Sequence, residues 1–220
     1  MPPATPLSLA DVQAVLSTPR FSTYLTAVGH DQAKAVALYE WNARVSAALM
    51  LPAHFVEVAV RNAVADVLKE VYGDRWPWDG NFRNTLPQGG PQGGYNQRAD
   101  LVNTAGGAAN SLDKVIANMK FVFWEKMLTS RHDVRLWTPH IGLAFPNCAG
   151  SPSAVRAAAN ADLELIRLLR NRIAHHEPII KVDLSRALAR MIELIRLRNE
   201  ATAQWVADVD EASQLILQKP

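Results

Sequence analysis

The sequence Leu-Ile-Arg-Leu-Leu-Arg-Asn-Arg-Ile-Ala-His-His-Glu-Pro, residues Leu165–Pro178, is the stretch around which the rest of the chain is organised. Its apolar residues recur at helical spacing, which predicts an amphipathic helix that ends before the proline. Polar side chains gather in its last turns. We expect this central helix to begin at an N-cap provided by Ser153 and to run to about His176.

Helical signals also fill most of the chain outside this stretch. Asp31 is a good N-cap for a helix over Gln32–Met50, and Pro52 suits the first turn of a separate helix that runs to about Tyr72. Shorter helices are expected over Leu9–Leu16 after a cap at Ser8, over Arg20–Val28, from Asn110 and Asp113 through Met119, over Phe121–Leu128, from Asp183 onward, and over Ala201–Leu217. No segment alternates at the period of two that a strand requires, so the predicted fold class is all-α.

Residues 74–107 have a different character. The segment Pro87-Gln88-Gly89-Gly90 is repeated at once as residues 91–94, and this density of proline and glycine excludes a regular element there. We expect an irregular, mobile Gly/Pro-rich loop insertion that contains a short helix at Gln97–Asn103. Two tryptophans at its start, Trp76 and Trp78, either anchor the loop to the core or stack on nucleic-acid bases.

Composition limits the remaining possibilities. The chain has 220 residues, of which 49% are hydrophobic, and this suits a single all-helical domain over residues 1–220 that carries the loop excursion. The net charge of +2 is weak, so any anion site must be local. The single cysteine excludes an internal disulfide framework. The N-terminus lacks the pattern of a signal peptide, and no apolar run of about 18 residues stands out, which predicts a cytoplasmic protein without a membrane partner.

The polar end of the central helix suggests a chemistry. At about 100° per residue, Asn171 and His175 share one helical face, whereas Arg170 lies about 140° around the axis from His175. One copy therefore forms an open site, and two copies across a two-fold axis would pool their arginines and histidines in one cleft. Histidine can take or donate protons at ribose and phosphate oxygens, and arginine can stabilise the charge of the transition state. These are the groups that metal-independent RNA cleavage needs, and DNA would be inert because it lacks the 2′-hydroxyl. The spacing alone does not decide between this chemistry and a structural role.

Other interpretations of the same residues stay open. Arginines at a helix end often form a solvated face, and histidines there are favoured by the helix dipole. The chain could then be a non-catalytic module that binds RNA or a partner, or a purely structural helical interaction protein. The histidine spacings place no two ligands on one helical face, so the sequence predicts no metal and no cofactor.

The spacing of Arg170 and His175 resembles the R-x4-6-H signature of the HEPN superfamily, and the wording of Leu169–Pro178 is similar to its Abi-like (abortive infection) branch. The likeness extends to other segments. Residues 38–49 resemble the family's first long helix, and residues 54–63 resemble its E-x3-R-N helix. The sequence Phe-Val-Phe-Trp at residues 121–124 and the segments around Trp137 and Phe145 are also similar, so the resemblance covers roughly residues 20–215 in the expected order.

The resemblance implies an all-helical HEPN-type bundle that forms a homodimer. It implies a ribonuclease of a phage-defence or toxin–antitoxin system, which a protein or RNA antitoxin holds inactive. Arg170 and His175 take the two named positions of the motif, and Asn171 is its polar residue. His176 is an adjacent histidine whose role, support of the site or none, the resemblance leaves open.

A second segment is implicated only through the resemblance. Glu57, Arg61 and Asn62 would line the cleft or orient the motif, or else Glu57 and Arg61 form a structural pair four residues apart on their own helix. Arg167 and Arg172 are weaker candidates for contacts with RNA.

Overall fold

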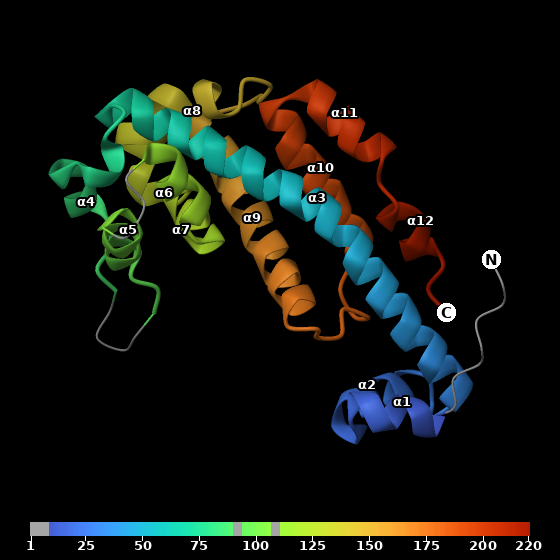
Figure 1. Ribbon diagram of the computed structural model, residues 1–220. Coiled ribbons are helices and arrows are strands. Elements are labelled where there is room, and N and C mark those ends of the chain that lie inside the picture. Colours follow the sequence, from blue (N-terminus) through green and yellow to red (C-terminus); the bar gives the residue numbers. More distant parts are fainter. Residues whose placement is uncertain (1–8, 90–93, 107–110) are drawn as a thin grey trace.

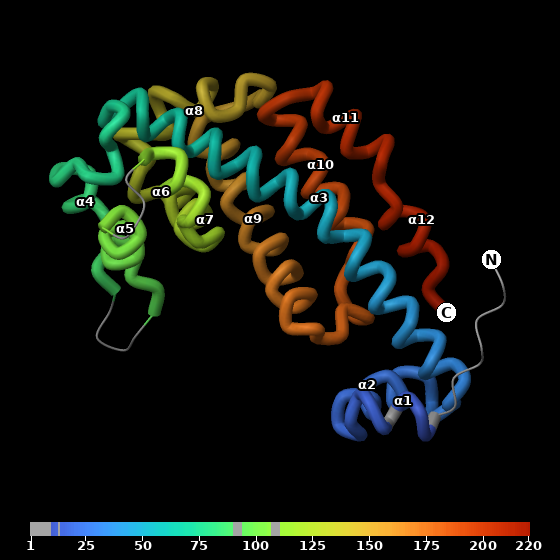
Figure 2. Tube along the Cα trace, in the orientation of Figure 1, coloured from blue at the N-terminus to red at the C-terminus, as the bar shows by residue number. Residues whose placement is uncertain are grey.

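The computed structural model describes residues 9–89, 94–106 and 111–220, and the regular elements in these ranges are all helical, which confirms the all-α class (Figure 1). Figure 2 shows that α3 runs the length of the molecule, with α1 and α2 at one end and α4 to α8 at the other. The elements are, in chain order, α1 (Leu9–Leu16), α2 (Thr18–Ala27), α3 (Gln32–Tyr72), η1 (Trp76–Trp78), α4 (Gly80–Thr85), α5 (Gln97–Gly106), α6 (Leu112–Asn118), α7 (Phe121–Met127), η2 (Ser130–His132), η3 (Asp133–Trp137), α8 (Thr138–Ala144), α9 (Pro152–Ala174), α10 (Leu184–Arg198), α11 (Glu200–Asp208) and α12 (Ala212–Leu217). The predicted starts at Ser8 and Asn110 lie outside the described residues.

The long helix α3 is continuous over 41 residues, so the prediction of two helices that meet near Pro52 is wrong. Asp31 caps its start as predicted, since the carboxylate accepts from the Lys34 backbone N–H at 3.0 Å. Gly73 ends it with a φ of 78°. Pro52 removes one backbone donor from the helix interior. The helix tolerates this loss because its apolar side, including Pro52 itself, is buried against α7, α8, α9 and α10.

Helix α3 also has the length and composition of a helix that could cross a membrane, which the sequence analysis did not expect. Its most apolar 18-residue window has a mean hydropathy of 1.4, and 33% of that window is buried. This is weak evidence for a membrane, because the core helix of a soluble protein meets the same criterion. In this fold α9 and α10 pack against α3.

The segment after α3 is more ordered than the predicted loop. Trp76 is fully buried and contacts the ring of Trp124, and Trp78 donates its indole N–H to the Ala105 carbonyl at 3.2 Å. Both tryptophans therefore anchor the segment to the rest of the protein. Asp79 caps α4, and α5 extends past the predicted short helix to Gly106. Residues 90–93 of the Pro-Gln-Gly-Gly repeat lie outside the described residues.

The central helix α9 begins two residues earlier than predicted. Ser151, and not Ser153, is its N-cap, because the Ser151 hydroxyl accepts from the Ala154 backbone N–H at 3.3 Å and Pro152 takes the first helical position. The helix ends at Ala174, close to the predicted end.

The C-terminal helices follow the prediction in part. Asp183 caps α10 as expected. The single helix predicted over Ala201–Leu217 is wrong, because the chain forms two helices there. The Asp210 carboxylate accepts from the backbone N–H groups of Ala212 and Ser213, at 2.9 and 3.0 Å, and so starts α12 after α11 has ended.

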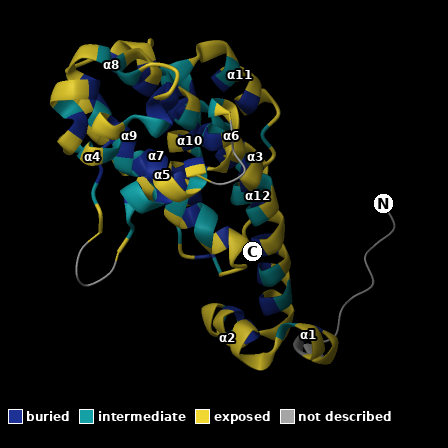
Figure 3. Cartoon of the chain, turned by 60° about the vertical axis from the view of Figure 1, so that its left-hand side comes forward, coloured by how far each residue is buried: buried dark blue, intermediate teal, exposed yellow. Residues whose placement is uncertain are grey.

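The buried side chains concentrate where α7, α9 and α10 meet α3, whereas α1 and α2 are largely exposed (Figure 3). Trp124 and Trp137 are fully buried, and the Trp137 indole donates to the Met127 carbonyl at 2.8 Å. The end of α9 lies beside α2, away from this aromatic core (Figure 1). Polar groups at that end therefore remain accessible.

Candidate functional site

Helix α9 ends in a left-handed turn that presents two adjacent histidines. The His176 N–H donates to the Ile173 carbonyl at 3.0 Å, and the Glu177 N–H donates to the Arg172 carbonyl at 2.8 Å. These two bonds form a Schellman motif, in which glycine usually takes the position of positive φ. That position is His176, with a φ of 55°. A residue with a side chain is destabilised there by about 1 kcal/mol.

Residues distant in the sequence hold this turn in place. The Arg20 guanidinium on α2 donates to the His176 carbonyl at 3.1 Å. The Asn42 side-chain oxygen on α3 accepts from the Ile179 backbone N–H at 2.9 Å, in a buried position. The end of α9 and the following loop are therefore attached to both α2 and α3, which fixes where the histidines lie.

Glu57 on α3 and Arg170 on α9, which only the family resemblance assigns to one site, lie close together. A carboxylate oxygen of Glu57 on α3 is 3.8 Å from a terminal guanidinium nitrogen of Arg170 on α9. Both side chains are partly exposed, by 27% and 37%. The structural pair that we considered between Glu57 and Arg61 is not among the ion pairs of the described residues, because Glu57 contacts Arg170 instead.

Arg61 and Arg170 each carry an unsatisfied donor. In the part of the chain that the structure describes, the Nε groups of both guanidinium ions are buried and have no hydrogen-bond partner. Leaving a buried donor without a partner costs about 1–3 kcal/mol, and more for a charged group. An anionic ligand that reached these groups would recover that free energy.

The other predicted arginines have different surroundings. Arg167 bonds through Nε to the carboxylate of Glu125, which is completely buried, and Lys126 contacts the second oxygen of that carboxylate at 2.8 Å. Arg167 is thus directed to α7 and away from the helix end. Arg172 lies 3.4 Å from Glu177, and both side chains are half exposed.

The remaining predicted residues are exposed or half-buried. Asn62 and His175 are exposed and Asn171 is half-buried, and their side chains make no hydrogen bond or ion pair with the described residues. Leu168, two helical turns before His175 on the same face, is 52% exposed although it is apolar. The structure thus shows an uncovered α9 face that carries Leu168, Asn171 and His175.

A small cavity of about 270 Å³ opens beside His176. Tyr24 comes from α2, and Tyr39, Asn42 and Ser46 come from one side of α3. Burial, together with the neighbouring Tyr39, raises the pKa of Tyr24 to about 12, so its hydroxyl remains a donor at neutral pH. These residues were not predicted as part of a site, and their one shared signal in the sequence is that Tyr39, Asn42 and Ser46 recur at helical spacing.

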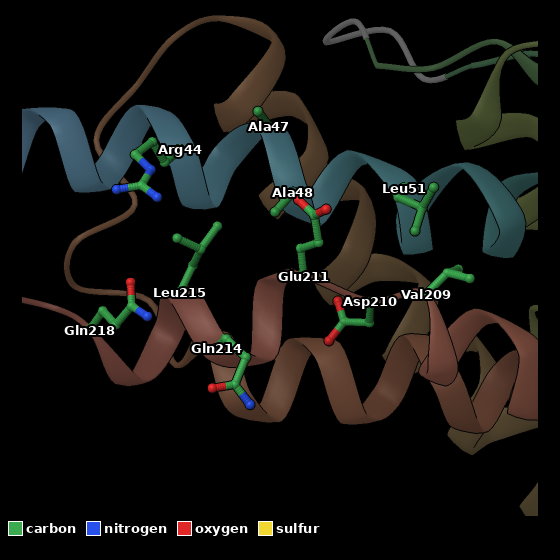
Figure 4. Close-up of a pocket in the computed structure, with 10 residues that line it drawn as sticks. All are labelled: Arg44, Ala47, Ala48, Leu51, Val209, Asp210, Glu211, Gln214, Leu215 and Gln218. Carbon is green, nitrogen blue, oxygen red and sulfur yellow. The ribbon is translucent and has the colours of Figure 1, made fainter. Parts of the chain in front are cut away.

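A larger groove of about 730 Å³ lies between α3 and α12 (Figure 4). Apolar residues such as Ala48, Leu51 and Leu215 line it, with Arg44 and Glu211 among its polar groups. It contains no histidine, and its Asp210 carboxylate already caps α12. The chemistry of the helix end is therefore absent from this groove.

Within the described ranges, no group of three or more His, Cys, Asp or Glu side chains is arranged to hold a metal ion. No protein-family model, curated protein or solved structure matches the chain.

Proposed function

We propose that the chain is a metal-independent endoribonuclease of the HEPN type that acts in the cytoplasm in an abortive-infection or toxin–antitoxin system. Arg170, Asn171 and His175 form its catalytic site at the interface of a homodimer. Glu57 and Arg61 support them from α3, and a protein or RNA antitoxin holds the enzyme inactive.

The contact between Glu57 and Arg170 is the observation that supports this proposal most directly. It places the polar segment of α3 that contains Glu57 beside the end of α9, and the unpaired Nε groups of Arg61 and Arg170 add two buried cationic donors. Such a cluster suits a phosphate, because guanidinium groups bind its oxygens strongly and keep their charge at any physiological pH.

Histidine supplies the proton transfers. One His175 takes the proton of the ribose 2′-hydroxyl, whose oxygen then forms a bond to phosphorus while the bond from phosphorus to the 5′-oxygen breaks. The His175 of the second copy donates a proton to the leaving 5′-oxygen. The products are a 2′,3′-cyclic phosphate and a 5′-hydroxyl. Arg170 stabilises the additional negative charge of the transition state.

The exposed face of α9 supports the dimer. Leu168 and His175 are one heptad apart, so an isologous contact through this face would cover the exposed leucine and bring two histidines together. One copy cannot provide this arrangement, since Arg170 is directed toward α3 and His175 toward solvent.

The test is to incubate the purified protein with mixed RNA in EDTA and to map new termini. We expect cleavage by the wild type, with a loss of about 100-fold or more in His175→Ala and in Arg170→Ala. DNA of the same sequence stays intact.

Two matched variants control for indirect effects. His140→Ala removes a half-buried histidine on α8 at the opposite end of α3, and Arg190→Ala breaks a similar ion pair, 3.5 Å from Asp162. Both should cleave like the wild type. If His175→Ala and Arg170→Ala also retain full activity, the residue assignment is rejected.

One observation favours a second function, a non-catalytic module that binds RNA or a protein partner. The His175 side chain makes no hydrogen bond with the described residues, so within one copy no such bond orients its imidazole for proton transfer. Such a module would bind RNA with an affinity that falls steeply with salt but would produce no new termini, and His175→Ala would bind like the wild type.

A further inference from the structure

We propose that the cavity between α2, α3 and the end of α9 is a subsite that binds one unpaired nucleobase of RNA. This inference deepens the proposed function, on which its link to cleavage rests. Such a subsite gives the enzyme a preference for the base next to the cleaved phosphate.

The lining of the cavity suits a flat heterocycle. Tyr39 supplies aromatic surface, and the fully buried Tyr24 packs edge-to-face against it, with the two ring centroids 5.0 Å apart. Asn42 and Ser46 supply an amide and a hydroxyl, which recognise the polar edges of bases. No carboxylate lines the cavity, so a ligand that carries phosphate is not repelled. Proteins bind single-stranded RNA with the same combination of aromatic surface and hydrogen-bonding side chains.

The side-chain amide of Asn42 is already oriented for this role. Its side-chain oxygen accepts from the Ile179 N–H, which fixes the orientation of the amide, so that its NH₂ group is free to donate to a base. The side chain is 7% exposed and is therefore protected from most of the solvent.

His176 gives an independent reason to assign a ligand to this cavity. It occupies the glycine position of the Schellman motif with a φ of 55°, and it is one of the residues that line the cavity. A residue held in a strained backbone conformation points to a functional role. His176 thus borders the cavity on the same turn that carries His175, the proposed catalytic group.

Arg20 extends the site toward the backbone of the RNA. Its guanidinium donates to the His176 carbonyl at 3.1 Å, and its charge acts on the nearby Tyr24 hydroxyl. A phosphate attached to the bound nucleoside would meet this exposed cation at the edge of the cavity. The subsite therefore joins α2, which the motif does not include, to the end of α9.

The test measures binding of 3′-AMP, 3′-GMP, 3′-CMP and 3′-UMP to the His175→Ala variant by calorimetry and by saturation-transfer NMR. We expect at least one to bind, with a preference for one base. In the same background, Ala43→Phe places a ring in the cavity from an exposed position and weakens that binding by about tenfold or more, because the stacking contact is lost. His176→Gly also weakens it, while its melting temperature stays equal or rises.

Ala37→Phe is the matched control. Ala37 is exposed on the same helix, about 120° around the axis from Ala43, and it does not line the cavity, so its ring stays outside. This variant should bind nucleotides like the parent. Circular dichroism of all variants checks that the helices remain folded.

The outcomes separate this inference from the proposed function. If RNA is cleaved but no nucleotide binds, or Ala43→Phe binds as Ala37→Phe does, the base subsite is wrong and the ribonuclease proposal stands. If a nucleotide binds and Ala43→Phe weakens it while RNA stays intact, the subsite stands and the ribonuclease proposal is wrong.

Discussion

Two arginines one turn apart on α9 have opposite surroundings. Arg167 is largely buried and bonds to the fully buried Glu125 on α7, whereas Arg170 lies 3.8 Å from the partly exposed Glu57 on α3 and has an unpaired Nε. Residue type and helix are the same. What differs is the depth of burial, and this decides whether a guanidinium holds the fold together or remains available to a ligand.

The contrast extends to the regions around the two arginines. Near α7, Arg156 forms two hydrogen bonds to Asp133, the shorter 2.8 Å, and a third to the Leu128 carbonyl. At the end of α9, by contrast, a histidine occupies a left-handed position and a cavity opens beside it. We infer that the α7 side provides stability, and that the end of α9 gives up some stability for accessible chemical groups.

The largest predicted effect compares the carboxylates of the two pairs. Glu125→Ala leaves Arg167 buried without its partner and should lower the free energy of unfolding by about 3–5 kcal/mol. Glu57→Ala breaks a loose, partly exposed contact and should lower it by less than about 1 kcal/mol. Urea denaturation followed by circular dichroism measures both, and similar losses in the two variants would contradict the assigned roles.

The next largest effect is the dependence of stability on pH that the buried His132 causes. Burial, followed by the charges of Arg131 and Arg135, lowers the pKa of His132 to about 4. The native state therefore binds fewer protons than the unfolded state, in which the pKa is about 6.5. Stability is fully present above pH 6.5 and falls by about 3 kcal/mol as the pH is lowered to 4.

Unfolding measured across this window tests the assignment to His132. His132→Gln should remove most of the dependence on pH, whereas His54→Gln, which changes an exposed histidine on α3, should retain it. An unchanged pH profile in His132→Gln would show that other groups cause the loss of stability in acid.

A smaller effect is expected at the strained turn. His176→Gly relieves a positive φ but adds conformational freedom to the unfolded chain, so the free energy of unfolding should stay the same or rise by up to about 1 kcal/mol. His175→Gly changes a residue with a φ of −91° and should give no such gain. A clear loss of stability in His176→Gly would mean that the imidazole is needed for the fold.

The smallest effect on stability is expected for Arg172→Ala. Its ion pair with Glu177 is half exposed, so the unfolding free energy should change by less than about 0.5 kcal/mol. If Arg172 contacts RNA, the plot of log affinity against log salt should become shallower by about 1. Glu177→Gln, which keeps the arginine, should leave that slope unchanged or make it steeper.

Local signals in the sequence predicted many of the helices. Asp31 and Asp183 begin α3 and α10 as expected, because a capping bond joins residues three apart and needs no distant partner. Pro52 shows the limit of this reasoning. Its local preference for a first turn was overridden by the packing of α3 on both sides of it.

The candidate site, like the fold, was predictable from the sequence only in part. The spacing of Arg170 and His175 on one helix was apparent from the sequence, and so was the polar end of that helix. The roles of the neighbouring arginines were not, because Arg167 and Arg170 look equivalent until their partners on α7 and α3 are known.

By itself, therefore, the sequence determined the helical class, several helix starts and the polar end of α9, since these depend on residues within a few positions of each other. Only the tertiary structure decided which charges are buried, which donors lack partners, and that α2 and α3 form a cavity beside His176. The contacts concerned join residues as far apart as Asn42 and Ile179, 137 positions apart, or Arg20 and His176, 156 positions apart. Such pairs leave no periodic signal, because packing of the whole bundle is what brings them together.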